Sequence, residues 1–186
     1  MSKKLSETLE NTELEFLNSL VKIIILKDLD NIALINGKIE SFKAGQEIEV
    51  SYWIAETLVN LNLAKFKEEE ITLVNLSKIH WKETLPTSRQ LPKLNKNFYC
   101  NLKRFLYRLS MEAKKEPSKL KDYEKALNIS RDIINCRIRK IASLASSPSV
   151  PENILSNLTI EEMQLYEGLR NIIYEWKKTI LSEEIW

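Results

Sequence analysis

Few residues of this sequence belong to the types that carry out catalysis. His80 is the single histidine, and the two cysteines, Cys100 and Cys136, lie far apart in the chain. A zinc site or a histidine-based triad needs more side chains than this set provides, and so does a disulfide framework. Cys136 could act as a nucleophile, but a small apolar residue that faces the core is the more frequent role of such a cysteine.

The acidic residues and the glycines do not indicate a catalytic centre. The four aspartates show no metal-ligand spacing, and the neighbouring Glu161 and Glu162 point to different faces of a helix. The favourable interaction of acids with the start of a helix accounts for that pair. Three glycines cannot form a phosphate-binding loop. We therefore expect a scaffold or binding protein that is not an enzyme and uses no cofactor or metal ion.

Composition indicates a folded protein with no contact with a membrane. Of the 186 residues, 44% are hydrophobic, which is too many for a disordered chain. The longest apolar run, Ile23 to Leu26, is far too short to cross a bilayer. Charged residues interrupt the N-terminal stretch throughout, so we expect no signal peptide and a cytoplasmic protein.

Charge is distributed unevenly along the chain. Residues 1–70 carry 8 lysines against 13 acidic residues, whereas residues 86–140 carry 15 basic residues against 5 acidic ones. A solvated helix face is the ordinary interpretation of such a basic region. The sharper interpretation is a surface for nucleic acid or for an acidic partner.

Residues 1–70 are predicted to form a small β-rich domain. Asn36-Gly37 is the strongest hairpin dipeptide, and Gly45 lies in a second turn over residues 43–46. Ser51 is expected to cap a helix that places Trp53 as a buried anchor against the sheet. A helix is expected over residues 5–20, strands over 21–27, 32–35, 39–42, 47–50 and 64–66, and a turn over 28–31.

Residues 71–186 are predicted to form a helical domain. Helices are expected over most of 71–81, over 98–113 and 117–145, and from Thr159, which forms a capping box with Glu162. Pro86 and Pro92 make residues 85–97 irregular, as a linker or a loop that crosses the body. The fold class is therefore α+β, a mostly α-helical bundle behind a small N-terminal sheet domain.

Apolar stripes predict the buried faces of the two longest helices, and the tryptophans are expected in the core. The first stripe is Leu120, Tyr123, Leu127, Ile134, Ile138 and Ile141, and the second is Ile160, Met163, Tyr166, Leu169, Ile173, Trp176 and Ile180. The long helix carries more apolar surface than this small body can cover, which indicates a subunit interface. Two roles stay open for Arg137 and Lys140, pairing within the body, with a helix end or Asp132, and contact with another subunit.

Several motifs, in order along the chain, resemble those of the GINS family of replication-factor subunits. In the sheet domain they are Ile35-x-Gly37, Phe42-x-x-Gly45 and Val50-x-x-Trp53-Ile54-Ala55-x-x-Leu58. In the helical body they are Arg137-Ile138-Arg139-Lys140-Ile141 and Asn157-Leu158-Thr159 with Glu162. Ser51 stands where the family often has proline, and a serine N-cap can replace the helix-starting role of that proline.

The resemblance implies a fold, an assembly and partners. It implies a helical A-domain and a B-domain that precedes it, as in the second and third PSF-type subunits of eukaryotes and in one archaeal subunit type. GINS subunits form a heterotetramer with a sister subunit, join the MCM helicase to a RecJ-like partner at the replication fork in the nucleoid, and can contact primase. The family has no known active site.

The resemblance and the patterns together select ten candidate structural or interface residues. They are Gly37, Gly45, Trp53, Arg137, Lys140, Ile141, Thr159, Glu162, Tyr166 and Trp176. The alternative function is a nucleic-acid-binding adaptor that uses residues 86–140, for which we expect salt-dependent DNA binding. Because this region lacks regular aromatic interleaving, we rate direct DNA contact below protein contact.

Overall fold

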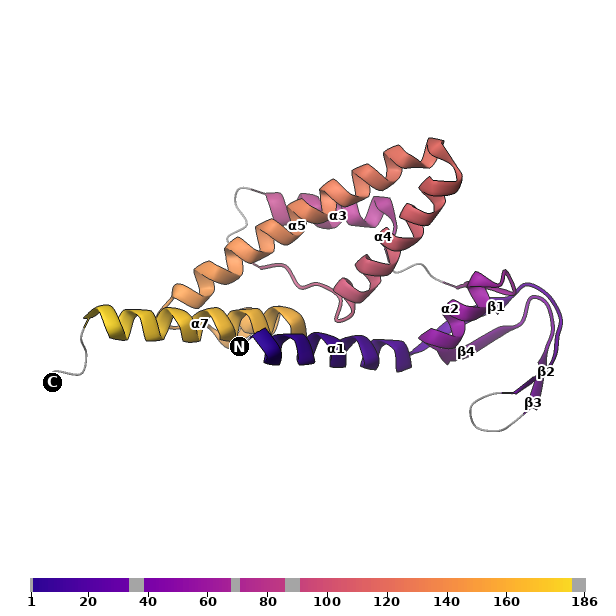
Figure 1. Ribbon diagram of the computed structural model, residues 1–186, viewed down its shortest axis with the longest axis horizontal. Helices are drawn as coiled ribbons and strands as arrows, with labels where there is room; N and C mark the ends of the chain where they lie inside the picture. The colour runs from indigo at the N-terminus through magenta and orange to yellow at the C-terminus, as the bar shows by residue number, and fades with distance from the viewer. Residues whose placement is uncertain (1, 34–38, 68–70, 86–90, 182–186) are drawn as a thin grey trace. The chain divides into compact units, whose positions relative to one another are not determined.

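A computed structural model of the chain describes residues 2–33, 39–67, 71–85 and 91–181 (Figure 1). Two compact units are present, a sheet unit of residues 13–70 and a helical unit of residues 1–12 and 71–186. The sequence-based division had kept residues 1–12 with the sheet. Helix α1 (Ser2–Asn18) contributes to both units. The fold class is α+β, as the sequence predicts.

The sheet unit is built from five short strands and one helix. They are β1 (Leu20–Ile25), β2 (Leu29–Ala33), β3 (Ile39–Phe42), β4 (Glu47–Ser51), α2 (Tyr52–Asn60) and β5 (Ala64–Phe66). Strand β1 lies between β4 and β5 in an antiparallel sheet, and β2 pairs with β3 in a separate antiparallel ribbon. The alternation of side chains places Ile23 and Ile25 of β1 in the core beside Val50 of β4.

Of the three predicted turns, the turn at Gly45 is confirmed, the turn over residues 28–31 is wrong, and the Asn36-Gly37 turn lies outside the described residues. Gly45 has a φ of +85°, which an L side chain rarely adopts, and its amide donates to the Ile25 carbonyl. The turn expected over residues 28–31 is wrong because β2 already begins at Leu29. The predicted Asn36-Gly37 turn lies outside the described residues, although the antiparallel β2–β3 pair that flanks it is present.

Trp53 is not the buried anchor that the sequence predicts, since 41% of it is exposed. Residue Ala55 of α2 is fully buried instead, and Tyr52 supplies the aromatic contacts. Its ring lies 4.4 Å from that of Phe16 and 5.3 Å from that of Phe66, centroid to centroid. One residue along a helix is a rotation of about 100°, so with the half-buried Tyr52 facing Phe16 and Phe66, Trp53 faces solvent. Ser51 is the N-cap residue of α2, but its side chain makes no capping hydrogen bond.

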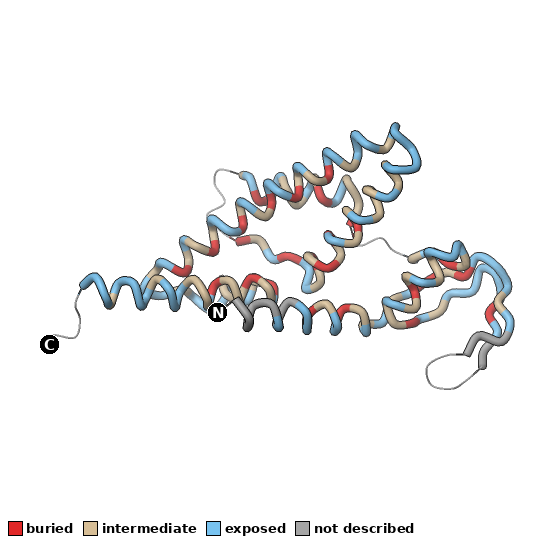
Figure 2. The backbone as a smooth tube through the Cα atoms, in the orientation of Figure 1, coloured by how far each residue is buried: buried red, intermediate tan, exposed pale blue. Residues whose placement is uncertain are grey.

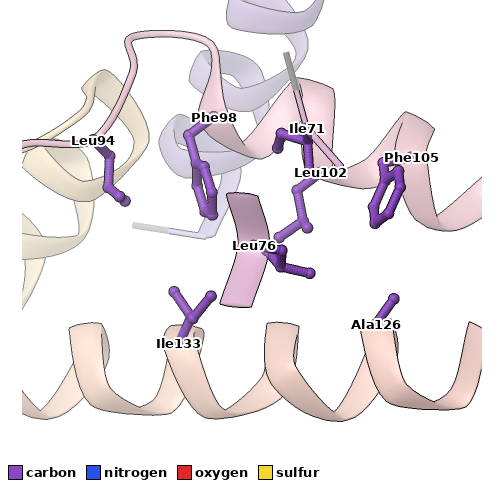
Figure 3. Close-up of a cluster of buried hydrophobic side chains, with 8 residues drawn as sticks. All are labelled: Ile71, Leu76, Leu94, Phe98, Leu102, Phe105, Ala126 and Ile133. Carbon is purple, nitrogen blue, oxygen red and sulfur yellow. The ribbon is translucent and has the colours of Figure 1, made fainter. Parts of the chain in front are cut away.

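The helical unit consists of α3 (Leu73–Thr84), α4 (Phe98–Lys115), a 3-10 turn η1 (Pro117–Lys119), α5 (Leu120–Ser146), α6 (Glu152–Leu155) and α7 (Ile160–Leu181), beside the first residues of α1. Its main core lies between α3, α4 and α5 (Figure 3). Leu76 of α3 is fully buried there, between Leu102 of α4 and Ile133 of α5. The helix predicted over 71–81 is thereby confirmed.

Residues 91–97 form a loop within the helical unit and not a linker between the units. The loop connects α3 to α4, and both helices belong to the helical unit. Leu91 and Leu94 are buried at 2% and 8% exposure, and Leu94 contributes to the main core. The irregular stretch is therefore the crossing loop among the two alternatives that the prolines left open.

The buried face of α5 is rotated from the predicted apolar stripe. The residues buried along α5 are Ala126, Ser130, Ile133, Arg137, Ile141 and Ala145, on one face of the helix (Figure 2). Leu120 and Ile138 of the predicted stripe are 46% and 43% exposed. The prediction missed this rotation because it scored only apolar residues, whereas two core positions are polar. Ser130 is satisfied by donating its hydroxyl to the Ala126 carbonyl, 2.7 Å away.

The tryptophans and one cysteine also differ from the predictions. Trp81 and Trp176 are 62% and 63% exposed, so neither is a core residue, and Trp186 lies outside the described residues. Cys100 is buried, but Cys136 is only half-buried rather than packed in the core.

Candidate subunit interface and buried ion-pair network

Arg137 of α5 lies at the centre of a buried network of charged groups. It is fully buried, with 0% exposure. Its guanidinium forms a bidentate pair with Glu162, in which Nε donates to Oε1 at 2.7 Å and Nη2 donates to Oε2 at 2.5 Å. From Nη1 it also donates to Glu83 Oε1 at 2.8 Å and to the Pro92 carbonyl at 2.6 Å. Four hydrogen bonds hold this planar group in one orientation.

Glu162 holds both the start of α7 and Arg137. Its Oε2 accepts from the Thr159 amide at 3.0 Å, while its own amide donates to the Thr159 hydroxyl at 3.3 Å. This reciprocal pair is the predicted capping box. The Tyr99 hydroxyl of α4 donates to Glu162 Oε1 at 2.6 Å. The carboxylate thus accepts four hydrogen bonds, which fills its acceptor sites.

Glu83 and Lys140 complete the network at the end of α3. Lys140 donates from Nζ to Glu83 Oε2 at 2.8 Å and to the Glu83 carbonyl at 3.1 Å. Glu83 is 3% exposed, and its side chain accepts from both cations. Two cations thus face two carboxylates, so the buried group is neutral overall. We call Arg137, Lys140, Glu83, Glu162, Tyr99 and the Pro92 carbonyl the Arg137 network.

The network shifts the pKa of two of its members upward. Burial alone would lower the pKa of Arg137, but the hydrogen bonds and charge of Glu162, and then those of Glu83, outweigh it and raise the pKa. For Tyr99, burial raises the pKa first, and the negative charge of Glu162 raises it further. Both shifts keep the protons in place, so the donors of the network persist at neutral pH.

The hydrogen bonds of this arrangement occupy its charged groups. The Glu162 carboxylate has no acceptor site left for a substrate proton, and Arg137 is enclosed by its partners. Among the described residues, no three His, Cys, Asp or Glu side chains gather where they could hold a metal ion. In that same part of the chain, none of the helices combines the length and apolarity that a membrane span requires.

An exposed apolar surface occupies the second half of α7. Ile172, Trp176 and Ile180 are 51%, 63% and 59% exposed, and their spacing of four residues places them along one side of the helix. We call these three residues the α7 apolar face. Such a cluster around a tryptophan is typical of a protein–protein contact, where aromatic residues supply much of the binding energy.

The structure brings together some of the predicted candidates and not others. Arg137, Lys140 and Glu162 meet in the Arg137 network, and Thr159 adjoins it through its capping box with Glu162. Ile141 and Tyr166 lie together in a small apolar cluster of α5 and α7. Gly45 and Trp53 belong to the sheet unit, Gly37 lies outside the described residues, and Trp176 lies on the α7 apolar face.

Sequence reasoning did not identify Glu83, Tyr99 or Pro92 as network members. A signal for Glu83 was present, since it follows Leu76 and Ile79 at spacings of seven and four and therefore shares their buried face. Asp132, the acid suggested as a partner of Arg137, instead lies beside His80, with 3.5 Å between Asp132 Oδ2 and His80 Nε2. Because Arg137 is fully buried and bound within the protein, this one basic residue of the 86–140 region is not available for contact with DNA.

A comparison with protein families identifies a model that matches most of the chain. The model is described as "Sld5: GINS complex protein helical bundle domain", and it matches residues 58–181, two thirds of the 186 residues. The matched range includes the whole described helical unit after residue 70, with the Arg137 network and the α7 apolar face. A comparison with curated proteins gives no match.

Proposed function

Because the chain belongs to the GINS family of DNA replication proteins, we propose that it is the B-domain-first subunit of an archaeal GINS complex. The family assignment makes it a scaffold subunit of a replication complex, with other GINS subunits as partners. GINS proteins are not catalytic, in keeping with an Arg137 network whose groups are all occupied. The scaffold acts by holding partners in position.

The order of the two units supports the B-domain-first proposal. The matched helical bundle is preceded by a sheet unit of residues 13–70 with its own apolar core of strands and one helix. A separate core allows a small unit to fold as a body of its own. In this proposal the sheet unit is the B-domain and residues 71–186 form the A-domain.

The α7 apolar face is the observation that carries the proposed assembly. Alternating exposed and buried positions would be expected of a helix lying on its own body, but from residue 170 onward nearly every position of α7 is exposed. The face therefore is available to a helix of a sister subunit, in a heterotetramer. The proposed assembly acts at the replication fork, where it joins the MCM helicase to a RecJ-like partner and contacts primase.

The proposal is tested by light scattering with a sister GINS subunit of the source organism, co-expressed with this chain. A stable complex with the mass of a heterotetramer is expected. Trp176→Ser removes the central side chain of the α7 apolar face and should weaken the complex at least tenfold. Tyr174→Ser is the matched control, because Tyr174 is a 60% exposed aromatic residue about 160° around the same helix.

The outcomes test separately whether the chain assembles with a sister subunit and whether the α7 apolar face is the surface that binds it. A chain that stays monomeric beside the sister subunit would contradict the scaffold proposal itself. A complex that forms equally well with Trp176→Ser would keep the scaffold proposal and reject this face. Association with MCM or with a RecJ-like protein is tested on the reconstituted complex, by co-elution of each partner in turn.

A further inference from the structure

The contact between α7 and the rest of the helical unit lies mainly in the first half of α7 and ends at Ile173. Apolar packing at this joint centres on three buried residues, Ile141 and Ala145 of α5 and Tyr166 of α7. From residue 170 to residue 181 only Ile173 and Lys178 are less than exposed. The direction of the exposed half of α7 is therefore set by a small contact region at the opposite end of the helix.

A small rotation at this joint has a large effect at the far end of α7. From Glu162 to Leu181 the helix extends about 28 Å, at about 1.5 Å per residue. A rotation of about 10° at the joint displaces the end by about 5 Å, which is close to one helical turn. A displacement of that size moves side chains out of register with a partner helix, because packed helices interlock their side chains turn by turn.

The Arg137 network supplies the directional contacts at the joint. Packing of apolar side chains is weakly directional, whereas a guanidinium bound to a carboxylate through two parallel hydrogen bonds fixes the plane and the angle of both groups. Arg137 holds Glu162 in this way, and Glu162 is fixed to the backbone of α7 through the Thr159 amide. The guanidinium is itself oriented by Glu83 of α3 and by the Pro92 carbonyl.

We propose that Arg137 is a positioning residue that sets the direction of α7 and thereby aligns the α7 apolar face with a sister subunit. The network connects α7 to three other parts of the helical unit, α3 through Glu83, α4 through Tyr99 and the 91–97 loop through Pro92. Its charges cancel, so it contributes geometry rather than net charge. This inference rests on the proposed function, because it assumes that the face binds a sister subunit.

The experiment measures, in variants of the full chain, the direction of α7 relative to α5 and the binding of the sister subunit. Spin labels at Asn128→Cys on α5 and Glu175→Cys on α7, both exposed positions, report the distance between the helices, after Cys100→Ala and Cys136→Ser remove the native thiols. The variants are Arg137→Gln and Glu162→Gln. Glutamine at 162 keeps the capping box, so Glu162→Gln removes the charge without removing the cap.

We expect both variants to broaden the distance distribution and to weaken binding of the co-expressed sister subunit at least tenfold. Leu102→Ala is the control, because Leu102 packs in the main core and is not one of the residues of the Arg137 network. It should lower thermal stability while leaving the distance and the affinity unchanged. If lost stability alone changed the distance and the affinity, Leu102→Ala would change them as well. The control therefore distinguishes a positioning role of Arg137 from a general effect on stability.

The results distinguish this inference from the proposed function. A folded Glu162→Gln variant with the wild-type distance and affinity would overturn the positioning role, even if Arg137→Gln failed to fold. If the distance broadens but neither Glu162→Gln nor Trp176→Ser changes the affinity, the α7 apolar face is not the interface. In that case the proposed surface fails, and with it the role of Arg137 in binding.

Discussion

Removal of the Arg137 side chain is predicted to destabilise the helical unit strongly. In Arg137→Met, Glu162 loses two charge-assisted hydrogen bonds and Glu83 loses one, while both carboxylates stay buried at 3% exposure. Breaking a buried ion pair from one side costs about 3–5 kcal/mol, because it leaves an uncompensated buried charge. We expect the free energy of unfolding to fall by about that amount.

The double variant gives a sharper expectation than the single one. Arg137→Met with Glu162→Met removes both charges and leaves Glu83 paired with Lys140. It still loses one half of the capping box, the hydrogen bond from the Thr159 amide to the Glu162 carboxylate, at a cost of up to about 1 kcal/mol. We therefore expect the double variant to be more stable than Arg137→Met alone, since replacing a buried pair by apolar residues is often neutral.

The measurement is urea unfolding of the full chain followed by far-UV circular dichroism, with the slope of the transition compared between variants. Lys140→Met is the control, because its side chain is 17% exposed and its charge is partly solvated. We expect it to lose less stability than Arg137→Met. A loss below about 1 kcal/mol in Arg137→Met, or a double variant that is less stable than Arg137→Met, would refute the argument from burial.

Three further predictions concern single positions. The pKa of Tyr99 lies above its ordinary value of 10.0, first through burial and then through Glu162, so the folded state keeps a proton that the unfolded state loses. Stability should therefore fall above about pH 10, and Tyr99→Phe should flatten that slope by up to about 1.4 kcal/mol per pH unit in urea titrations. Gly45→Ala should cost about 1 kcal/mol by thermal unfolding, because its φ is +85° and the added Cβ meets nothing within 4 Å, so only backbone strain acts. A cost near zero would contradict that conformation. Trp53→Ala should cost about 1 kcal/mol, well below the roughly 3–5 kcal/mol of a buried tryptophan, and a larger loss in urea unfolding would restore Trp53 to the core.

Much of the fold could be predicted because it depends on short-range patterns. The Thr159–Glu162 capping box and the Gly45 turn are each decided within four residues of backbone, and both occur where the sequence places them. The helices after residue 70 follow from their apolar periodicity. The rotation of α5 did not follow, because a periodic pattern cannot show that Ser130 and Arg137 are satisfied inside the core.

The candidate site divides in the same way. The sequence could select Arg137 and Glu162 through motifs, but it could not pair them, because 25 residues separate them and 54 separate Arg137 from Glu83. Pairing at that range depends on which faces of α3, α5 and α7 pack together. Exposure of Trp53 and Trp176 was missed for the same reason, since an apolar residue gives no sign of whether its own chain covers it.

The sequence by itself thus determined the local elements, the α+β class and the absence of enough catalytic residue types for a histidine triad or a zinc site. Local hydrogen bonds, caps and turns involve only neighbouring residues, so a short stretch of sequence is enough to predict them. Only the tertiary structure decided that two cations and two carboxylates meet in a neutral buried group and that α7 leaves an apolar face uncovered. Those features depend on how distant helices pack. Charges that are buried must pair in a fixed geometry, and apolar area that the packing leaves exposed can bind a partner.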